Sequence, residues 1–165
     1  RMGKTDIKSL PLEQLEQWAV EHGEEKFRAK QLYQWMHVKL VDDPEQMSNL
    51  SAAFRQEIRE NCTFTVLKQV TMQESALDGT RKYLFELEDH NMVESVLMRY
   101  KHGNSVCISS QVGCRMGCRF CASTLDGLER NLRPSEMLDQ IYQIQRDPMW
   151  LSWEPENRWI IMTIF

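Results

Sequence analysis

Long apolar runs are missing from this 165-residue chain. A membrane-spanning helix needs roughly 18 to 20 consecutive apolar residues, and no stretch approaches that length, so we expect no membrane span. No apolar run follows residues 1–6, so we expect no secretory signal peptide. Internal repeats and low-complexity linkers are also lacking. Hydrophobic residues still make up 42% of the chain, which predicts a core of ordinary size.

Cysteine is scarce and unevenly distributed. The chain has five cysteines, an odd number, and three of them fall within residues 114–121. This is a poor framework for disulfides and is typical of a metal or cluster site in a reducing compartment. We therefore expect a cytoplasmic protein. The four histidines match no metal-site spacing, and we expect them at the surface.

An overall excess of positive charge is absent as well. The net charge of −4 argues against a basic nucleic-acid-binding protein on bulk electrostatics. Residues 99–133 differ, with six Lys or Arg against two acids, which is 6 − 2 = +4. Such a locally basic surface around the cysteines could attract phosphates, although scattered solvated charges would give the same count.

Residues 1–62 have the apolar periodicity of helices. The pattern predicts a first helix after Pro11 that stops at Gly23, and a second over residues 27–36. Ser48 is a candidate cap for a third helix. We expect this region to form a small helical domain.

Beyond Cys62 the periodicity changes to that of β-strands. Asp78-Gly79 is a hairpin turn signal. A helix is expected from Pro134 onward. The predicted strands cover residues 64–67, 70–72, 83–87, 93–98 and 106–110. The cysteine-rich segment thus lies between a strand and a helix, as the first loop of a β/α unit would.

Cys114, Cys118 and Cys121 have the spacing C-x3-C-x2-C, with an aromatic residue just before the third thiol. Three thiolates can fill three iron corners of a [4Fe–4S] cluster and leave the fourth iron open to a small molecule. Gly113 and Gly117 favour a loop rather than a helix, because glycine relaxes the backbone. The spacing therefore favours an open-cornered iron–sulfur cluster.

Two alternatives stay open at this point. Structural zinc takes four ligands, and only Cys118 and Cys121 form the C-x2-C pair that is common in such sites. The remaining zinc ligands would have to come from Cys62, Cys107 or a histidine. The third reading is that the cysteines are buried, inert thiols.

The cysteine motif with its flanks resembles the radical S-adenosylmethionine (SAM) enzymes that methylate C2 of adenine in 23S ribosomal RNA and in tRNA. The matching stretches are residues 106–114, 118–124, 131–132, 27–33 and 49–51. The likeness spans roughly residues 5 to 147, and the flanks distinguish this RNA-methylating group from the wider superfamily. A relative that methylates C8 of the same ribosomal adenine is an alternative.

The resemblance implies roles for five residues. Cys114, Cys118 and Cys121 would hold a [4Fe–4S] cluster whose open iron binds SAM. Cys107 matches the position of the family's resolving cysteine, which forms a transient disulfide, and Glu94 matches its proton acceptor. Without the resemblance, Cys107 would be read as a packed core thiol and Glu94 as a solvated carboxylate.

The resemblance also implies a fold and partners. We expect an α+β N-terminal region, with a helical domain and a small antiparallel sheet, followed by the truncated start of a radical SAM β/α partial barrel. The expected segments are an RNA-contacting helical domain at 1–62, a small β region at 63–100, a barrel start at 101–147 and an aberrant tail at 148–165. The expected partners are 23S rRNA, tRNA and a flavodoxin-type electron donor, and the protein is expected to be a monomer.

The chain departs from the family pattern in length and in its tail. Family members are about twice as long, and their methyl-accepting cysteine near the C-terminus has no counterpart here. Residues 148–165 hold three of the five tryptophans and read as a frameshift product. We therefore expect an incomplete, inactive chain whose strand at 106–108 is an unpaired sheet edge. The alternative is a catalytically dead RNA-binding or zinc-stabilised fragment.

Overall fold

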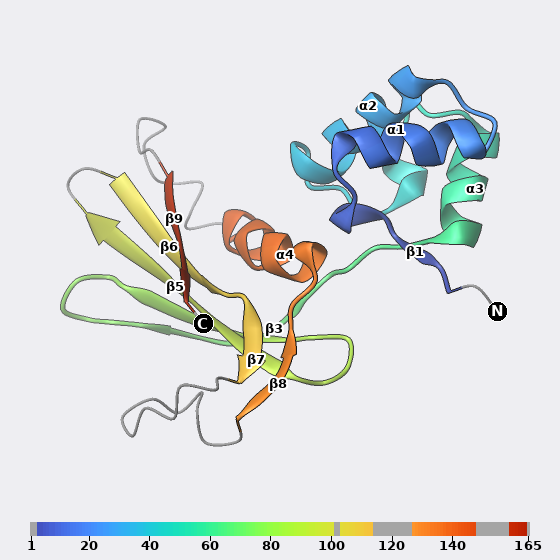
Figure 1. Cartoon of the computed structure of the whole chain (residues 1–165). Helices are drawn as coiled ribbons and strands as arrows, with labels where there is room; N and C mark the ends of the chain where they lie inside the picture. The colour runs from blue at the N-terminus through green and yellow to red at the C-terminus, as the bar shows by residue number, and fades with distance from the viewer. Residues whose placement is uncertain (1–2, 101–102, 114–126, 148–158, 165) are drawn as a thin grey trace. The chain divides into compact units, whose positions relative to one another are not determined.

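The chain divides into two compact units, residues 1–65 and residues 66–165. A computed structural model describes residues 3–100, 103–113, 127–147 and 159–164, the last range by its backbone (Figure 1). The expected mixture of helices with a small antiparallel sheet is confirmed. The domain boundaries at residues 62, 100 and 147 stay predictions.

The first unit is mainly helical, as its periodicity predicts. Its elements are β1 (Thr5–Asp6), η1 (Ile7–Ser9), α1 (Leu12–Glu21), α2 (Lys26–His37), η2 (Pro44–Gln46), α3 (Ala52–Asn61) and β2 (Cys62–Thr63). α1 stops just before Gly23, whose φ of 82° is readily adopted only by glycine. Ser51, not Ser48, caps α3, because its Oγ accepts a hydrogen bond from the Phe54 N–H at 3.1 Å. The predicted cap was three residues early.

A buried cation lies in the otherwise apolar core of this unit. Lys8 is 1% exposed, and its Nζ lies 2.8 Å from Asp42 Oδ1 and donates to the Thr65 carbonyl at 2.8 Å. Burial and the nearby charge of Lys8 lower the pKa of His37 to about 4. His37 is partly buried, so the expectation of a surface histidine is wrong at this position.

The second unit is built on a mixed sheet. Its elements are β3 (Lys68–Glu74), β4 (Arg81–Glu86), β5 (Met92–Tyr100), β6 (Gly103–Ser109), β7 (Gln111–Gly113), β8 (Leu128–Asn131), α4 (Pro134–Gln145) and β9 (Trp159–Ile164). Within the described residues the strand order is β3-β4-β5-β6-β9, antiparallel except for the parallel pair β6–β9. The strand expected at 64–67 is wrong, since that stretch is irregular and β3 begins at Lys68.

The edge of the sheet is not where the sequence predicts it. β6 pairs with β5 on one side and with β9 on the other, from Asn104↔Trp159 to Ser109↔Ile164. The expectation that residues 106–108 form an unpaired edge is therefore wrong. β3 is an edge strand instead, and all of its residues are exposed.

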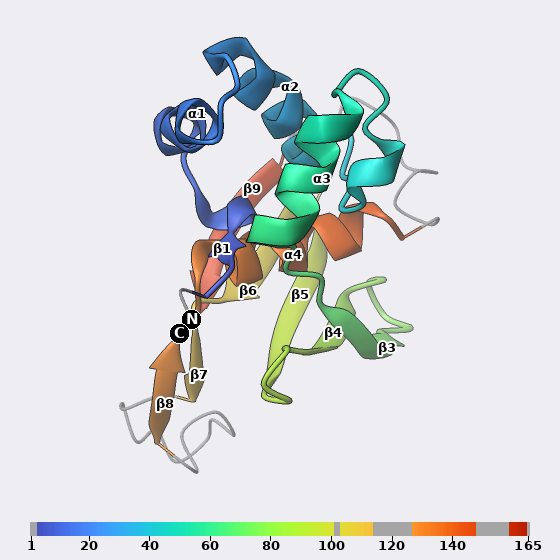
Figure 2. The same ribbon diagram turned by 90° about the vertical axis from the view of Figure 1, so that its right-hand side faces the viewer.

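Helix α4 lies along one face of the sheet (Figures 1 and 2). Alternate residues of β4 and β5 are buried, among them Tyr83 and Leu97. Tyr83 Oη donates to Asp147, just beyond the helix, at 2.9 Å. Period-two burial is expected when one face of a strand packs against a helix. Figure 2 shows β7 and β8 extending from the sheet as a separate two-stranded ribbon.

Candidate functional site

Glu94 and Cys107 lie on the same face of the sheet, opposite α4. In the antiparallel register Cys107 is paired with Val96, and directly paired residues share a face. Glu94 is two residues from Val96 along β5 and shares its face. The intervening residue, Ser95, points to the helix side, where its Oγ donates to Gln140 of α4 at 2.8 Å. Two residues that lie 13 positions apart in the sequence are thus brought to one face of the sheet.

The two side chains have different surroundings. Glu94 is half-exposed, and its Oε1 lies 2.7 Å from Lys82 Nζ on the neighbouring strand. Cys107 is 8% exposed and forms no disulfide with the other described cysteine, Cys62. Burial raises the pKa of the Cys107 thiol, so this group is protonated at neutral pH.

Gln140 binds the end of β6, the strand that leads through β7 to residues 114–126, which we call the cysteine segment. Its Oε1 accepts from the Ser109 N–H at 2.9 Å, and its Nε2 donates to the Ser109 carbonyl at 2.8 Å. Both backbone groups of the last residue of β6 are thereby paired with one side chain of α4. Sequence reasoning missed Gln140, because a glutamine on a helical pattern carries no signal of a partner 31 residues away.

The cysteine segment is flanked by the paired strands β7 and β8, and we call the close approach of Gly113 to Gly127 between them its neck. Cys114, Cys118 and Cys121 lie outside the described residues, but the two strands that flank them are paired, with Gly113 opposite Leu128. Gly113 has a φ of 73°, and a Cβ built there would overlap the carbonyl oxygen of Gly127 and lie 2.9 Å from its carbonyl carbon. Only glycine allows this close approach of two backbones.

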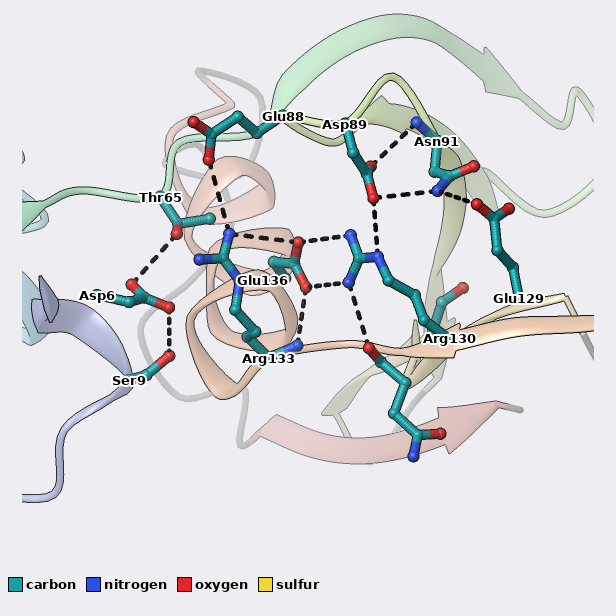
Figure 3. A network of polar contacts seen from close by, with 12 residues as sticks. Asp6, Ser9, Thr65, Glu88, Asp89, Asn91, Glu129, Arg130, Arg133 and Glu136 are labelled. Carbon is teal, nitrogen blue, oxygen red and sulfur yellow. Dashed lines mark hydrogen bonds and ion pairs between the residues drawn. The ribbon is translucent and has the colours of Figure 1, made fainter. Parts of the chain in front are cut away.

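Arg130 of β8 lies between two carboxylates (Figure 3). Its Nη1 and Nη2 donate to the two carboxylate oxygens of Glu136, each at 2.9 Å, and its Nε donates to Asp89 Oδ2 at 2.8 Å. The hydrogen bond from Arg130 lowers the pKa of Asp89 to about 2. Burial opposes ionisation of Glu136, but hydrogen bonds from Arg130 and the Arg133 N–H bring the pKa of Glu136 below its ordinary value.

Three further findings concern metal sites, the Cys62 thiol and membrane-spanning helices. Among the described residues, no group of three or more His, Cys, Asp or Glu side chains is arranged to hold a metal ion. Cys62 is buried in the first unit, and burial with the nearby Glu57 raises the pKa of its thiol to about 12. In the part of the chain that the structure describes, no helix is long and apolar enough to cross a membrane.

Comparisons with known proteins agree with the resemblance seen in the sequence. The family model of the ribosomal RNA large subunit methyltransferase N-terminal domain matches residues 5–64. The probable dual-specificity RNA methyltransferase RlmN of Lachnospira eligens is 64% identical over 142 residues, which cover 86% of this chain and 41% of that protein. The protein of the same name from Lachnoclostridium phytofermentans is 57% identical over 159 residues, or 96% of this chain and 44% of that protein.

A comparison with solved structures agrees with these sequence matches. The crystal structure of a radical SAM methyltransferase from Sphaerobacter thermophilus superposes with a TM-score of 0.81 at 32% identity, covering 96% of this chain and 47% of that one. The chain spans about two-fifths of the length of the curated relatives it matches. In sequence and fold, the chain therefore matches the N-terminal part of the dual-specificity RNA methyltransferases named RlmN.

Proposed function

We propose that this chain is the N-terminal part of a radical SAM methyltransferase that methylates C2 of adenine in 23S rRNA and tRNA. The supporting observation is the 64% identity with a protein named as a dual-specificity RNA methyltransferase, over 86% of this chain. A match of that length includes Glu94, Cys107 and the three clustered cysteines. The C8-methylating relative is the alternative, and no described residue favours it.

Cys114, Cys118 and Cys121 are the proposed ligands of a [4Fe–4S] cluster. The donor set fits, because three thiolates leave one iron open, and because the Gly113–Gly127 neck closes the backbone just before the first ligand. When bound, the cluster and SAM supply reductive radical chemistry, which no amino-acid side chain provides.

Glu94 and Cys107 are proposed to act from the sheet face opposite α4. In a β/α barrel the helices lie outside, so the face opposite α4 corresponds to the interior of the proposed partial barrel. Glu94 is the proposed proton acceptor there, with Lys82 balancing its charge at 2.7 Å. Cys107 is the proposed resolving thiol. Its burial keeps it protonated, so it must lose its proton before it can form a sulfur–sulfur bond.

The helical unit is the proposed RNA-contacting part, and α2 supplies a suitable surface. Lys26 and Lys30 are exposed on this helix, and Phe27 is 47% exposed. The Arg28 guanidinium lies 4.7 Å from the centre of the Phe27 ring. Cations beside an exposed aromatic ring can bind phosphates and stack on unpaired bases. Exchanging Lys26 and Lys30 for Gln should weaken tRNA binding and reduce its salt dependence, whereas Lys68→Gln, which removes an exposed charge outside the helical unit, should do neither.

The 165-residue chain by itself is proposed to be inactive, monomeric and cytoplasmic, with a flavodoxin-type electron donor for the whole enzyme. The match to the Lachnoclostridium phytofermentans protein covers 96% of the chain and so reaches beyond residue 147. The frameshift proposal for residues 148–165 is tested by sequencing the coding DNA.

Anaerobic reconstitution with iron and sulfide tests the proposed cofactor. We expect about four irons per chain, the visible absorption of a thiolate-bound cluster, and an electron paramagnetic resonance (EPR) spectrum that changes when SAM is added. Cys118→Ser should abolish these signals, and Cys62→Ser should not. Stoichiometric zinc without colour would refute the cluster, and methyl transfer to RNA by the chain alone would refute its proposed inactivity.

A further inference from the structure

The two strands that carry the cysteine segment form too small a ribbon to be stable alone. β7 has three residues and β8 has four, and they pair only with each other among the described residues. An isolated two-stranded ribbon is at best marginally stable in water. Something else must hold its position relative to the sheet and α4.

Arg130 makes that connection from the middle of the ribbon. It is paired across the ribbon with Val112, one residue before Gly113. Its guanidinium reaches two other elements at once: Glu136 in the first turn of α4, through two parallel hydrogen bonds of 2.9 Å, and Asp89 in the β4–β5 turn, through one of 2.8 Å (Figure 3).

The pair with Glu136 differs from an ordinary surface ion pair. The Glu136 side chain is 2% exposed, whereas that of Arg130 is 29% exposed. Glu136 also accepts the Arg133 N–H at 2.8 Å, which fixes the carboxylate at the start of the helix. Bidentate arginine–carboxylate pairs set direction as well as distance, and a buried carboxylate that loses its partner is costly.

We propose that the Arg130–Glu136 pair, steadied by Asp89, is a positioning device that holds the neck of the cysteine segment in the geometry the cluster requires. This inference rests on the proposed function, in which Cys114, Cys118 and Cys121 are the cluster ligands. Neither Arg130 nor Glu136 is among the proposed cluster ligands. They act through the ribbon, because fixing Gly113 and Leu128 on either side of the ligand segment reduces the chain entropy that is lost when the ligands bind.

The test compares iron retention in reconstituted variants of the whole chain. Arg130→Gln removes the charge and both parallel hydrogen bonds. We expect it to release iron to a chelator about 10- to 100-fold faster than the unmodified chain, as supporting groups around metal ligands typically do when lost. The EPR spectrum of the reduced cluster should broaden, which a purely structural role far from the ligands would not cause. Lys68→Gln, which breaks the exposed Lys68–Glu86 pair of the same sheet, is the matched control and should retain iron normally.

Two further variants keep the result interpretable. Arg130→Lys keeps the charge but cannot form the two parallel hydrogen bonds to Glu136. A normal rate of iron release in this variant would therefore overturn the role of bidentate geometry. Asp89→Asn removes only one charged partner at a site 42% exposed, so it should fold even if Arg130→Gln does not, and it should raise the release rate by a smaller factor. Release rates in Asp89→Asn and in folded Arg130→Gln that equal the unmodified rate would overturn the proposal.

The outcome also separates this inference from the proposed function. If the unmodified chain binds no cluster, or if Cys118→Ser retains it, the proposed function fails. If the unmodified chain binds a cluster that depends on Cys118 and the Arg130 variants retain it equally well, only the positioning role fails.

Discussion

Replacing Gly113 by alanine should open the neck of the cysteine segment. Two costs combine at this position. A φ of 73° costs a non-glycine residue about 1–2 kcal/mol. The new Cβ would also overlap the Gly127 carbonyl oxygen and lie 3.3 Å from Leu128 Cα, and relieving such a clash by moving backbone costs a further 1–3 kcal/mol, roughly.

Gly127→Ala provides a matched comparison. Gly127 has a φ of 72°, but a Cβ there meets nothing within 4 Å. The backbone conformation alone should therefore destabilise this variant, by about 1–2 kcal/mol. Since every 1.4 kcal/mol is about tenfold in an equilibrium constant, the further 1–3 kcal/mol should make the open neck about 5- to 140-fold commoner in Gly113→Ala than in Gly127→Ala.

Amide hydrogen exchange in β7 and β8 measures this opening directly. We expect faster exchange there in Gly113→Ala than in Gly127→Ala, with the helical unit unchanged, and a lower iron content after reconstitution in the same order. Equal exchange and equal iron content in the two variants would refute the reasoning, because both have a positive φ and only Gly113 has the close backbone contact.

Three other perturbations test the fold that supports the site. Ser51→Ala should lower the free energy of unfolding of the helical unit by about 1 kcal/mol in urea, followed by Trp fluorescence, while Ser48→Ala should have little effect. The unfolding free energy should fall as the pH drops from 6.5 to about 4, because the unfolded chain protonates His37 before the folded chain does, and His37→Gln should flatten this dependence. Gln140→Leu should lower the melting temperature of the second unit, since it removes the partner of the buried Ser95 hydroxyl and of both backbone groups of the partly buried Ser109, and a buried group left unpaired costs about 1–3 kcal/mol. A melting curve identical to that of the unmodified chain would show that water replaces Gln140.

The local sequence pattern predicts most helices and strands well, but it predicts the pairing of the strands poorly. The 3–4 periodicity before Cys62 and the alternation after it identified the main helices and strands, because each reflects burial of one face of a single element. The error at Ser48 is one of position, since several nearby residues are chemically able to cap a helix. The pairing of β6 with β9 was not foreseen, because it joins residues about 55 apart and depends on no local signal.

For the candidate site, too, the sequence identified some of the residues but not how they are arranged. Glu94 and Cys107 were identified through a resemblance, whereas their common face follows from the register of β5 on β6. The glycine at position 113 was expected only as a residue that relaxes the backbone, and the structure adds a close approach to Gly127. Gln140 was not identified, because its importance depends on contacts with residues far away in sequence.

The sheet separates two kinds of polar residue, and this has a consequence for mutagenesis. Polar groups on the α4 face, such as Ser95 and Gln140, are buried and bonded to one another, so their loss should act first on stability. Glu94, on the opposite face, is half-exposed and makes its ion pair in solvent, where such pairs contribute at most about 1 kcal/mol. Glu94→Gln should therefore leave the melting temperature nearly unchanged. A loss of function in that variant, within a complete enzyme, would then report on chemistry rather than on folding.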